Sequence, residues 1–268
     1  MSDSGRWTAL GTEQYVVASA TLETRFRIGV AQPLGPGGAP PRQLGDGESL
    51  PVIYVIDADG LFGLAVDTVR CLQIGELVPA ALVVGIGYDS ATEISDWVQL
   101  RVSHLTPTAA RHPRTNTTNT GYADAFLDFI SGTVKPFVEA RYPADPSDAT
   151  LVGDSLGGLF ATHALFRQPE AFQRYLIASP ALAWDNQITF RYASEYTASH
   201  SDLRARVFLS AGALETEEML ANMDRMASHL REQRYPSLSL TTKVFEDETH
   251  SSVIPATFST GLRSVFSA

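Results

Sequence analysis

Short apolar runs alternate along the chain with longer stretches in which apolar residues recur at helical spacing. The short runs are rich in β-branched and aromatic residues and predict strands, whereas the longer stretches predict helices. The predicted strands cover residues 13–20, 24–31, 52–56, 81–86, 150–152, 175–178, 207–210 and 238–245. The predicted helices cover residues 61–74, 122–142, 159–167, 217–234 and 253–266.

The order of these elements predicts the fold class. Strands that alternate with helices form a mostly parallel sheet covered by helices on both faces, so we expect an α/β fold. The first two strands are expected at an edge of this sheet. Pro136 lies inside the long predicted helix, which its ring and its missing N–H should kink or divide.

The domain organisation follows from the same pattern. Residues 31–51 are loaded with Gly and Pro, which predicts a flexible loop. No internal repeat is evident, and no linker separates two cores. We therefore expect a single domain, 1–268, which is large enough to bury a sizeable core.

Charge and cysteine content restrict the partners. A formal net charge of −10 and a pI near 5.0 argue against nucleic acid, whose phosphates would be repelled. Cys71, the only cysteine, excludes an intramolecular disulfide and fits a reducing compartment. No apolar run has membrane-spanning length and residues 1–5 do not resemble a signal peptide, so we expect a cytoplasmic protein. We expect neither a metal nor a cofactor, because no cluster has metal-ligand spacing and no phosphate or dinucleotide loop is present.

The strongest chemical signal is the run 151–160, in which an apolar strand stops at Ser155 between Gly153 and Gly157. With an apolar helix after it, this run predicts a nucleophile elbow, a sharp turn that holds a serine hydroxyl exposed above the sheet. The two glycines allow strand and helix to approach closely. Because a serine hydroxyl is a poor nucleophile at neutral pH, it needs a base and a third group that orients the base.

The base is expected after Ser155, since the chain order at such elbows is nucleophile, acid, histidine. His163 and His229 fall in predicted helices, and His200 follows a polar run. His250 instead lies in the loop after the last predicted strand, and the carboxyl ends of strands are where open α/β sheets build their sites. We therefore predict His250 as the base.

The acid has two candidates. Glu215 lies just past the penultimate predicted strand, whereas Glu217 and Glu218 suit the first turn of the next helix. Asp247 is the competitor, because a carboxylate on the same loop as His250 could reach the imidazole. We favour Glu215, since the orienting acid of a triad comes from a separate strand end.

An oxyanion hole needs two backbone N–H groups. Leu156, directly after the nucleophile, is the first predicted donor. The second is expected in the loop after strand 52–56, at Asp59 or at the neighbouring Gly60.

Candidate substrate contacts lie in segments that follow strands. Arg101, Tyr88 and Trp97 lie in the long segment after the fourth strand, and Trp184 lies after the sixth. Arg101 could bind an anionic substrate or pair with a nearby carboxylate, and the tryptophans could contact ligand or pack. The polar run 111–120 is interpreted as a lid or a loop.

Several segments together resemble one known family. They are residues 54–60, 85–88, 101 with 105–108, 123–130, 179–180 with 184–186, and 250–253. Over nearly its whole length the chain resembles the esterase D-type branch of the α/β-hydrolase superfamily, nearest the bacterial ferric-siderophore esterases. The resemblance implies an α/β-hydrolase fold and hydrolysis of a carboxylic ester, which in the nearest subgroup is a macrocyclic trilactone.

The chain departs from that family at three positions. Asp154 precedes the nucleophile where His is commoner, Ala58 stands where Gly is frequent, and His104 stands where the subgroup often has Asp. The expected activity is therefore cleavage of a small-molecule ester, without assignment of its acyl and alcohol parts. Acyl transfer or thioester hydrolysis by the same residues is an alternative, and a non-catalytic binding protein on this scaffold is a less favoured one.

Overall fold

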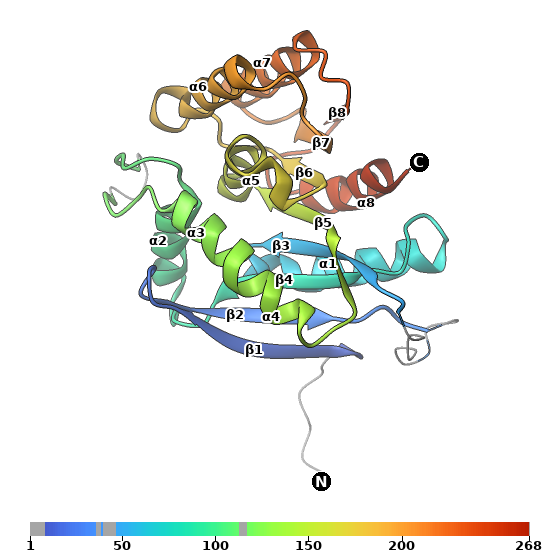
Figure 1. Ribbon diagram of the computed structural model, residues 1–268. Helices are drawn as coiled ribbons and strands as arrows, with labels where there is room; N and C mark the ends of the chain where they lie inside the picture. The colour runs from blue at the N-terminus through green and yellow to red at the C-terminus, as the bar shows by residue number, and fades with distance from the viewer. Residues whose placement is uncertain (1–8, 36–38, 40–46, 113–116, 268) are drawn as a thin grey trace.

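A single eight-stranded sheet organises the protein (Figure 1). The computed structural model describes residues 9–35, 39, 47–112 and 117–267. The strands are β1 (Thr12–Ser19), β2 (Thr24–Ala31), β3 (Leu50–Ile56), β4 (Leu82–Tyr88), β5 (Ala144–Asp154), β6 (Arg174–Ala178), β7 (Ala205–Gly212) and β8 (Leu238–Phe245). Their order is β1-β2-β4-β3-β5-β6-β7-β8, and all neighbours from β4 to β8 are parallel. β1 pairs with β2 and β2 with β4 in antiparallel fashion, which confirms the predicted edge position of the first two strands.

Helices cover both faces of the sheet, which confirms the predicted fold class (Figure 1). On one face lie α1 (Ala58–Ile74) and α8 (Val253–Phe266). The opposite face carries α2 (Ile94–Leu105), α3 (Ala123–Phe129), α4 (Lys135–Glu139), α5 (Leu156–Arg167), α6 (Trp184–Ser199) and α7 (Glu217–Glu232). A short 3₁₀ turn, η3 (Pro169–Ala171), precedes β6.

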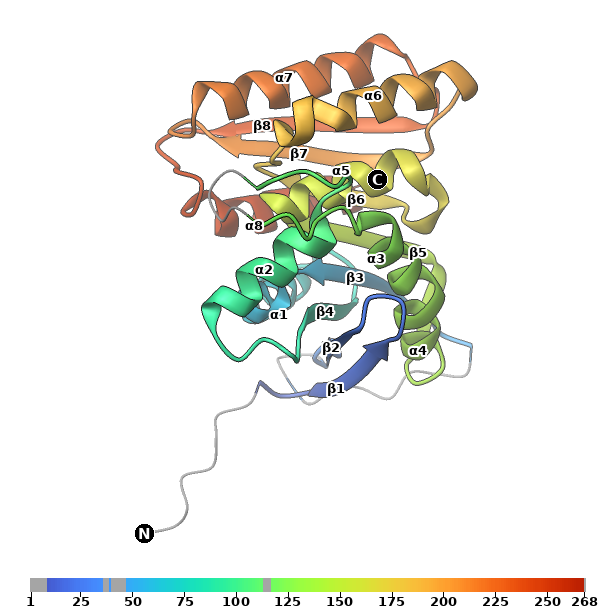
Figure 2. The same cartoon turned by 90° about the vertical axis from the view of Figure 1, so that its left-hand side faces the viewer.

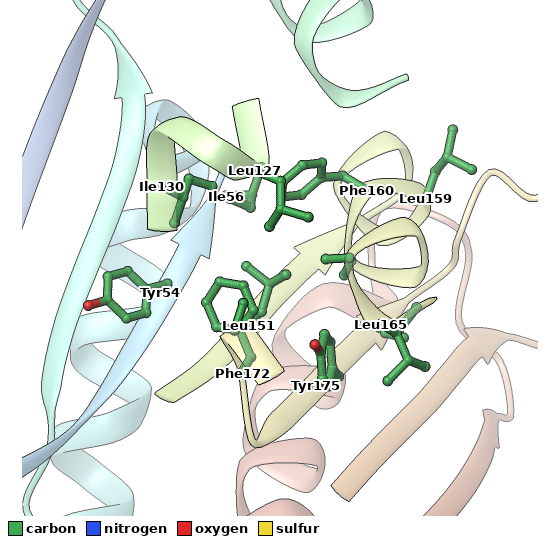
Figure 3. Packing of buried hydrophobic residues seen from close by; sticks show 14 of the residues in the cluster. Tyr54, Ile56, Leu127, Ile130, Leu151, Leu159, Phe160, Leu165, Phe172 and Tyr175 are labelled. Atoms are coloured by element: carbon green, nitrogen blue, oxygen red, sulfur yellow. The ribbon is translucent and has the colours of Figure 1, made fainter. Parts of the chain in front are cut away.

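Alternating side chains divide the interior into two cores. Tyr54 and Leu151 point to the larger core, between the sheet and the α5 side, whereas their neighbours Val55 and Val152 point to the core beneath α1 and α8. Figure 3 shows the larger core, where Phe160 of α5 packs near residues of β3, β5 and α3. β3 and the second half of β5 are therefore buried on both faces.

The long helix predicted over residues 122–142 is divided. A π-helical turn, η2 (Ile130–Val134), separates α3 from α4, and the Lys135 N–H donates to the Ile130 carbonyl. Pro136 occupies the first turn of α4, a position that accommodates a proline ring. The predicted division is confirmed, and it takes the form of a π-helical turn.

Two helices have no counterpart among the predicted elements. α2 lies between β4 and α3, and α6 follows β6. Figure 2 shows α6 lying beside α7 over β7 and β8, at the end of the sheet opposite β1. Both helices line the same cavity as Ser155, Glu215 and His250, the predicted catalytic residues that follow β5, β7 and β8.

Candidate active site

Ser155 occupies a strained turn between β5 and α5. Its φ of 58° and ψ of −113° lie outside the regions that L-residues prefer, and its N–H donates to the Ala178 carbonyl at 3.0 Å. A Cβ on Gly153 would lie 2.1 Å from the Gly157 carbonyl oxygen, so only glycine permits this approach of strand and helix. The local backbone is thus the strand-turn-helix elbow that the sequence predicts.

His250 and Glu215 reach Ser155 from two other strand ends. His250 Nε2 lies 3.0 Å from Ser155 Oγ, and His250 Nδ1 lies 2.9 Å from Glu215 Oε2. Glu215 belongs to the loop between β7 and α7, and His250 to the loop between β8 and α8. The three side chains therefore form a continuous hydrogen-bonded chain.

The other histidines after the elbow lie elsewhere. His163 is buried on α5 and bonds through Nε2 to Asp124 Oδ1 at 2.8 Å. His229 lies on α7 beside Thr197, and His200 stacks on Tyr196 at the end of α6.

Glu215 is fixed by two further donors. Its side chain is fully buried, and Oε1 accepts hydrogen bonds from Ser179 Oγ at 2.5 Å and from the Gly212 N–H at 2.8 Å. Burial alone would raise the pKa of Glu215, but the hydrogen bonds from His250, Ser179 and Gly212 outweigh it and lower the pKa. Asp247, the alternative acid, is exposed at a left-handed turn. The geometry thus brings Glu215 to the imidazole.

The pKa of His250 is raised above that of a free histidine. The hydrogen bond to Glu215 is the largest cause, burial opposes it, and the charges of Asp154 and Glu215 add to the increase. A histidine in this setting is ready to accept a proton, and the resulting imidazolium is stabilised by its neighbours.

The two predicted oxyanion donors have different surroundings. Leu156 begins α5 and lines the cavity beside Ser155. The Asp59 carboxylate instead accepts hydrogen bonds from Arg27 and from the Tyr88 N–H, both at 2.9 Å, and Asp59 is not among the cavity-lining residues described below. The Gly60 N–H donates to the Asp57 carbonyl at 3.0 Å. Asp59 as the second donor stays a prediction.

A cavity of about 980 Å³ opens in front of Ser155 and His250. Its wall combines apolar surface with charged groups at several positions. Leu214, 62% exposed, forms part of its apolar rim. Besides the catalytic candidates, the lining includes Val98, Arg101, Val102, Ala110, Arg111, His112, Leu156, Ala181, Leu182, Ala183, Trp184, Asp185, Asn186, Thr216, Glu218, Met219, Asn222 and Thr249.

Of the four predicted substrate contacts, Arg101 and Trp184 line this cavity. Arg101 Nε also donates to Asp57 Oδ1 at 2.7 Å, so the residue both pairs with a carboxylate and faces the cavity. Its guanidinium lies 4.9 Å from the ring centre of Trp97, which is half-buried and packs against the larger core. Tyr88 is 3% exposed and stacks with His104, so the structure places it in the core and not at the cavity.

The sequence did not indicate the turn that opens α6. Asp185, Asn186 and Gln187 all have positive φ, and two of them face the cavity. Thr108 Oγ1 donates to Asp185 Oδ2 at 2.6 Å and accepts from Trp184 Nε1 at 3.2 Å, which ties this turn to the segment after α2. The predicted lid or loop 111–120 contributes Arg111 and His112 to the wall, and its residues 113–116 lie outside the described part.

Within the described residues, no group of three or more His, Cys, Asp or Glu side chains could hold a metal ion. Over the same part of the chain, the helices are all too short or too polar to cross a membrane.

The eight-stranded sheet, the elbow at Ser155 and the site at the strand ends define an α/β-hydrolase fold. Residues 39–252 match the family described as "Putative esterase", and the chain belongs to that family.

The chain is 30% identical to the ferri-bacillibactin esterase BesA of Bacillus subtilis, over 97% of this chain and 91% of that protein. It is 31% identical to the siderophore triacetylfusarinine C esterase of Aspergillus fumigatus, over 84% of each. The crystal structure of the BES protein from Bacillus cereus superposes with a TM-score of 0.84 at 27% identity, covering 99% of this chain and all of that one. Ester hydrolysis is the activity that these relatives support.

Proposed function

We propose that the protein is a serine hydrolase that cleaves a carboxylic ester through an acyl-enzyme on Ser155. The supporting observation is the hydrogen-bonded chain from Ser155 Oγ through His250 to Glu215, with distances of 3.0 and 2.9 Å. Catalysis by a serine requires this order of nucleophile, base and orienting acid.

The first half of the reaction forms the acyl-enzyme. His250 Nε2 takes the proton of Ser155 as Oγ bonds to the ester carbonyl carbon, and the carbonyl oxygen becomes an oxyanion. Glu215 accepts from Nδ1–H, which leaves the Nε2 lone pair free for the serine proton and stabilises the imidazolium. The imidazolium then gives its proton to the departing alcohol oxygen as the carbon–oxygen bond breaks.

The second half releases the acid. Water loses a proton to His250 and attacks the acyl carbon, and Ser155 Oγ leaves as it regains a proton. The backbone N–H groups of Leu156 and Asp59 are our proposed donors to the oxyanion in both halves. The positive φ at Ser155 supports the role of Leu156, because at a turn of this kind the first N–H groups of the following helix have no partner within the helix.

We further propose that the substrate is a small-molecule ester of the siderophore type, including a lactone. The relatives named as a ferri-bacillibactin esterase and as a siderophore triacetylfusarinine C esterase support this choice. A cavity of about 980 Å³ has room for a large organic ligand, since ligand sites commonly span roughly 300–1,000 Å³. Arg101 and Arg111 supply positive charge and Trp184 supplies an apolar surface, so Arg101 and Trp184 remain proposed substrate contacts. Cytoplasmic location stays a prediction based on the sequence.

The test is hydrolysis of p-nitrophenyl esters of graded acyl length, together with fluorophosphonate labelling. Ser155→Ala should abolish both turnover and labelling. Ser199→Ala, which changes an exposed serine of α6, should leave both at the parent level. A Ser155→Ala protein that retains turnover would refute the mechanism. Products formed with added alcohols would separate hydrolysis from acyl transfer, and thioester substrates would test thioesterase activity.

A further inference from the structure

Asp154, the last residue of β5, is a buried acid beside the proposed nucleophile. It is only 8% exposed, and its Oδ1 has no hydrogen-bond partner among the described residues. A buried carboxylate oxygen without a donor is costly, so its presence at this position calls for a role beyond folding.

Charged groups surround Asp154 from four other elements. Asp57 follows β3, Arg101 belongs to α2, Glu215 precedes α7, and His250 precedes α8. Asp57 and Asp154 each lie two residues beyond Val55 and Val152, which are paired across β3 and β5. Asp57 Oδ2 is likewise buried, with no partner among the residues that the structure describes.

The Asp57 carboxylate is already paired, since Arg101 donates to its Oδ1 at 2.7 Å. Glu215 is likewise held by three donors. Asp154 Oδ1, in contrast, has no hydrogen-bond partner in the described structure, and the imidazolium of His250 is the nearby cation that appears and disappears during the reaction.

We propose that Asp154 is a positioning residue that acts through His250, because its buried charge favours the protonated imidazole and thereby sets how the site responds to pH. This role rests on the proposed function for its catalytic consequence. The charge of Asp154 is poorly screened because the residue is buried, so it acts on His250 more strongly than a surface carboxylate at similar distance.

The same surroundings also shift the pKa of Asp154, and the charges of Asp154 and His250 act on each other. Burial is the largest cause and raises the pKa of Asp154 to about 7. The positive charges of His250 and Arg101 oppose this increase, whereas the negative charge of Asp57 adds to it. The two groups therefore titrate as a coupled pair, in which a proton on one depends on the charge of the other.

The test is NMR titration of the His250 imidazole in the full-length protein and its Asp154→Asn variant. Removal of the charge should lower the pKa of His250 by about one unit, as expected for the loss of one nearby opposite charge. The matched control is Asp247→Asn, which removes an exposed carboxylate three residues from His250 and should leave the titration unchanged. The decrease in the pKa of His250 caused by Asp154→Asn should be about as large at roughly 0.5 M NaCl as at low salt, because salt screens buried charges only weakly.

The catalytic readout is the pH profile of kcat/KM. Its acid limb should move to lower pH by the same amount in Asp154→Asn, because the rate depends on neutral His250. An unchanged His250 titration in Asp154→Asn, or an equal shift in Asp247→Asn, would overturn the proposal. Should Asp154→Asn fail to fold, Asp154→Ser removes the same charge with a smaller side chain and is judged by the same criteria. Absence of esterase activity with the expected NMR shift would count against the proposed function alone.

Discussion

Replacement of Glu215 by Gln tests the link between the acid and the base. The variant keeps the size of the side chain, and its amide oxygen can still accept from the Gly212 N–H and Ser179. The amide nitrogen then faces His250 Nδ1, where the carboxylate accepts in the parent. Two donors cannot share that contact, so His250 is driven to the tautomer that carries its proton on Nε2. In that form Nε2 cannot accept the proton of Ser155.

The size of the loss follows from the charge that Glu215 provides. The carboxylate is fully buried and lies 2.9 Å from Nδ1 of the imidazolium that forms in the transition state. At an effective dielectric constant of about 20, an opposite charge at about 4 Å contributes about 4 kcal/mol. This energy corresponds to roughly a thousandfold decrease in kcat, before the cost of the wrong tautomer.

The assay is kcat for a short-chain p-nitrophenyl ester, measured between pH 6 and 9 with Asp247→Asn as the control. Glu215→Gln should retain the fold and lose activity at every pH, while Asp247→Asn should stay within a few-fold of the parent. A Glu215→Gln enzyme within threefold of the parent, or an equally severe loss in Asp247→Asn, would contradict the role of Glu215 as the orienting acid.

Two stability predictions follow from buried residues. Burial lowers the pKa of His104 from 6.5 to about 4. Between these two pH values the unfolded state binds a proton at His104 that the folded state does not bind. The free energy of unfolding should therefore fall by about 3 kcal/mol between pH 7 and pH 4 because of this residue. Urea denaturation of His104→Phe should show a correspondingly weaker loss on acidification; an identical pH dependence would contradict this. Gly153→Ala should cost at least about 1–3 kcal/mol or prevent folding, because its Cβ meets the Gly157 carbonyl. Gly63→Ala, a helix position with open space, should instead raise the melting temperature, and comparable losses in both variants would refute the steric argument.

Much of the fold could be predicted because the strands are short, apolar and separated by helices of clear period. Residues 24–31, 238–245 and 253–266 match the observed elements to the residue. α6 was missed because it opens with three left-handed residues, Asp185 to Gln187, and continues with many polar side chains. Hydrophobic periodicity has no means of indicating a helix that begins in that way. α2 was missed for a related reason, since buried residues occupy only its last turn.

The three proposed catalytic residues could be predicted from their positions after strands. Ser155, Glu215 and His250 each follow a strand, and the carboxyl ends of parallel strands meet at one edge of the sheet. Tyr88 also ends a strand, but its side chain points into the aromatic cluster with Phe26 and His104, a direction fixed by sheet register. The hydrogen bond from Ser179 to Glu215 depends on the conformation of a loop, which sequence pattern does not encode.

In the proposed mechanism, Ser155 carries the acyl group during turnover. The most direct measurement is acid quench of the enzyme during hydrolysis of p-nitrophenyl acetate, followed by intact-protein and peptide mass spectrometry. We predict one acetyl group per chain, on the peptide that contains Ser155, and none in Ser155→Ala. Turnover with the acetyl group on another residue, or undiminished turnover by Ser155→Ala, would contradict the mechanism.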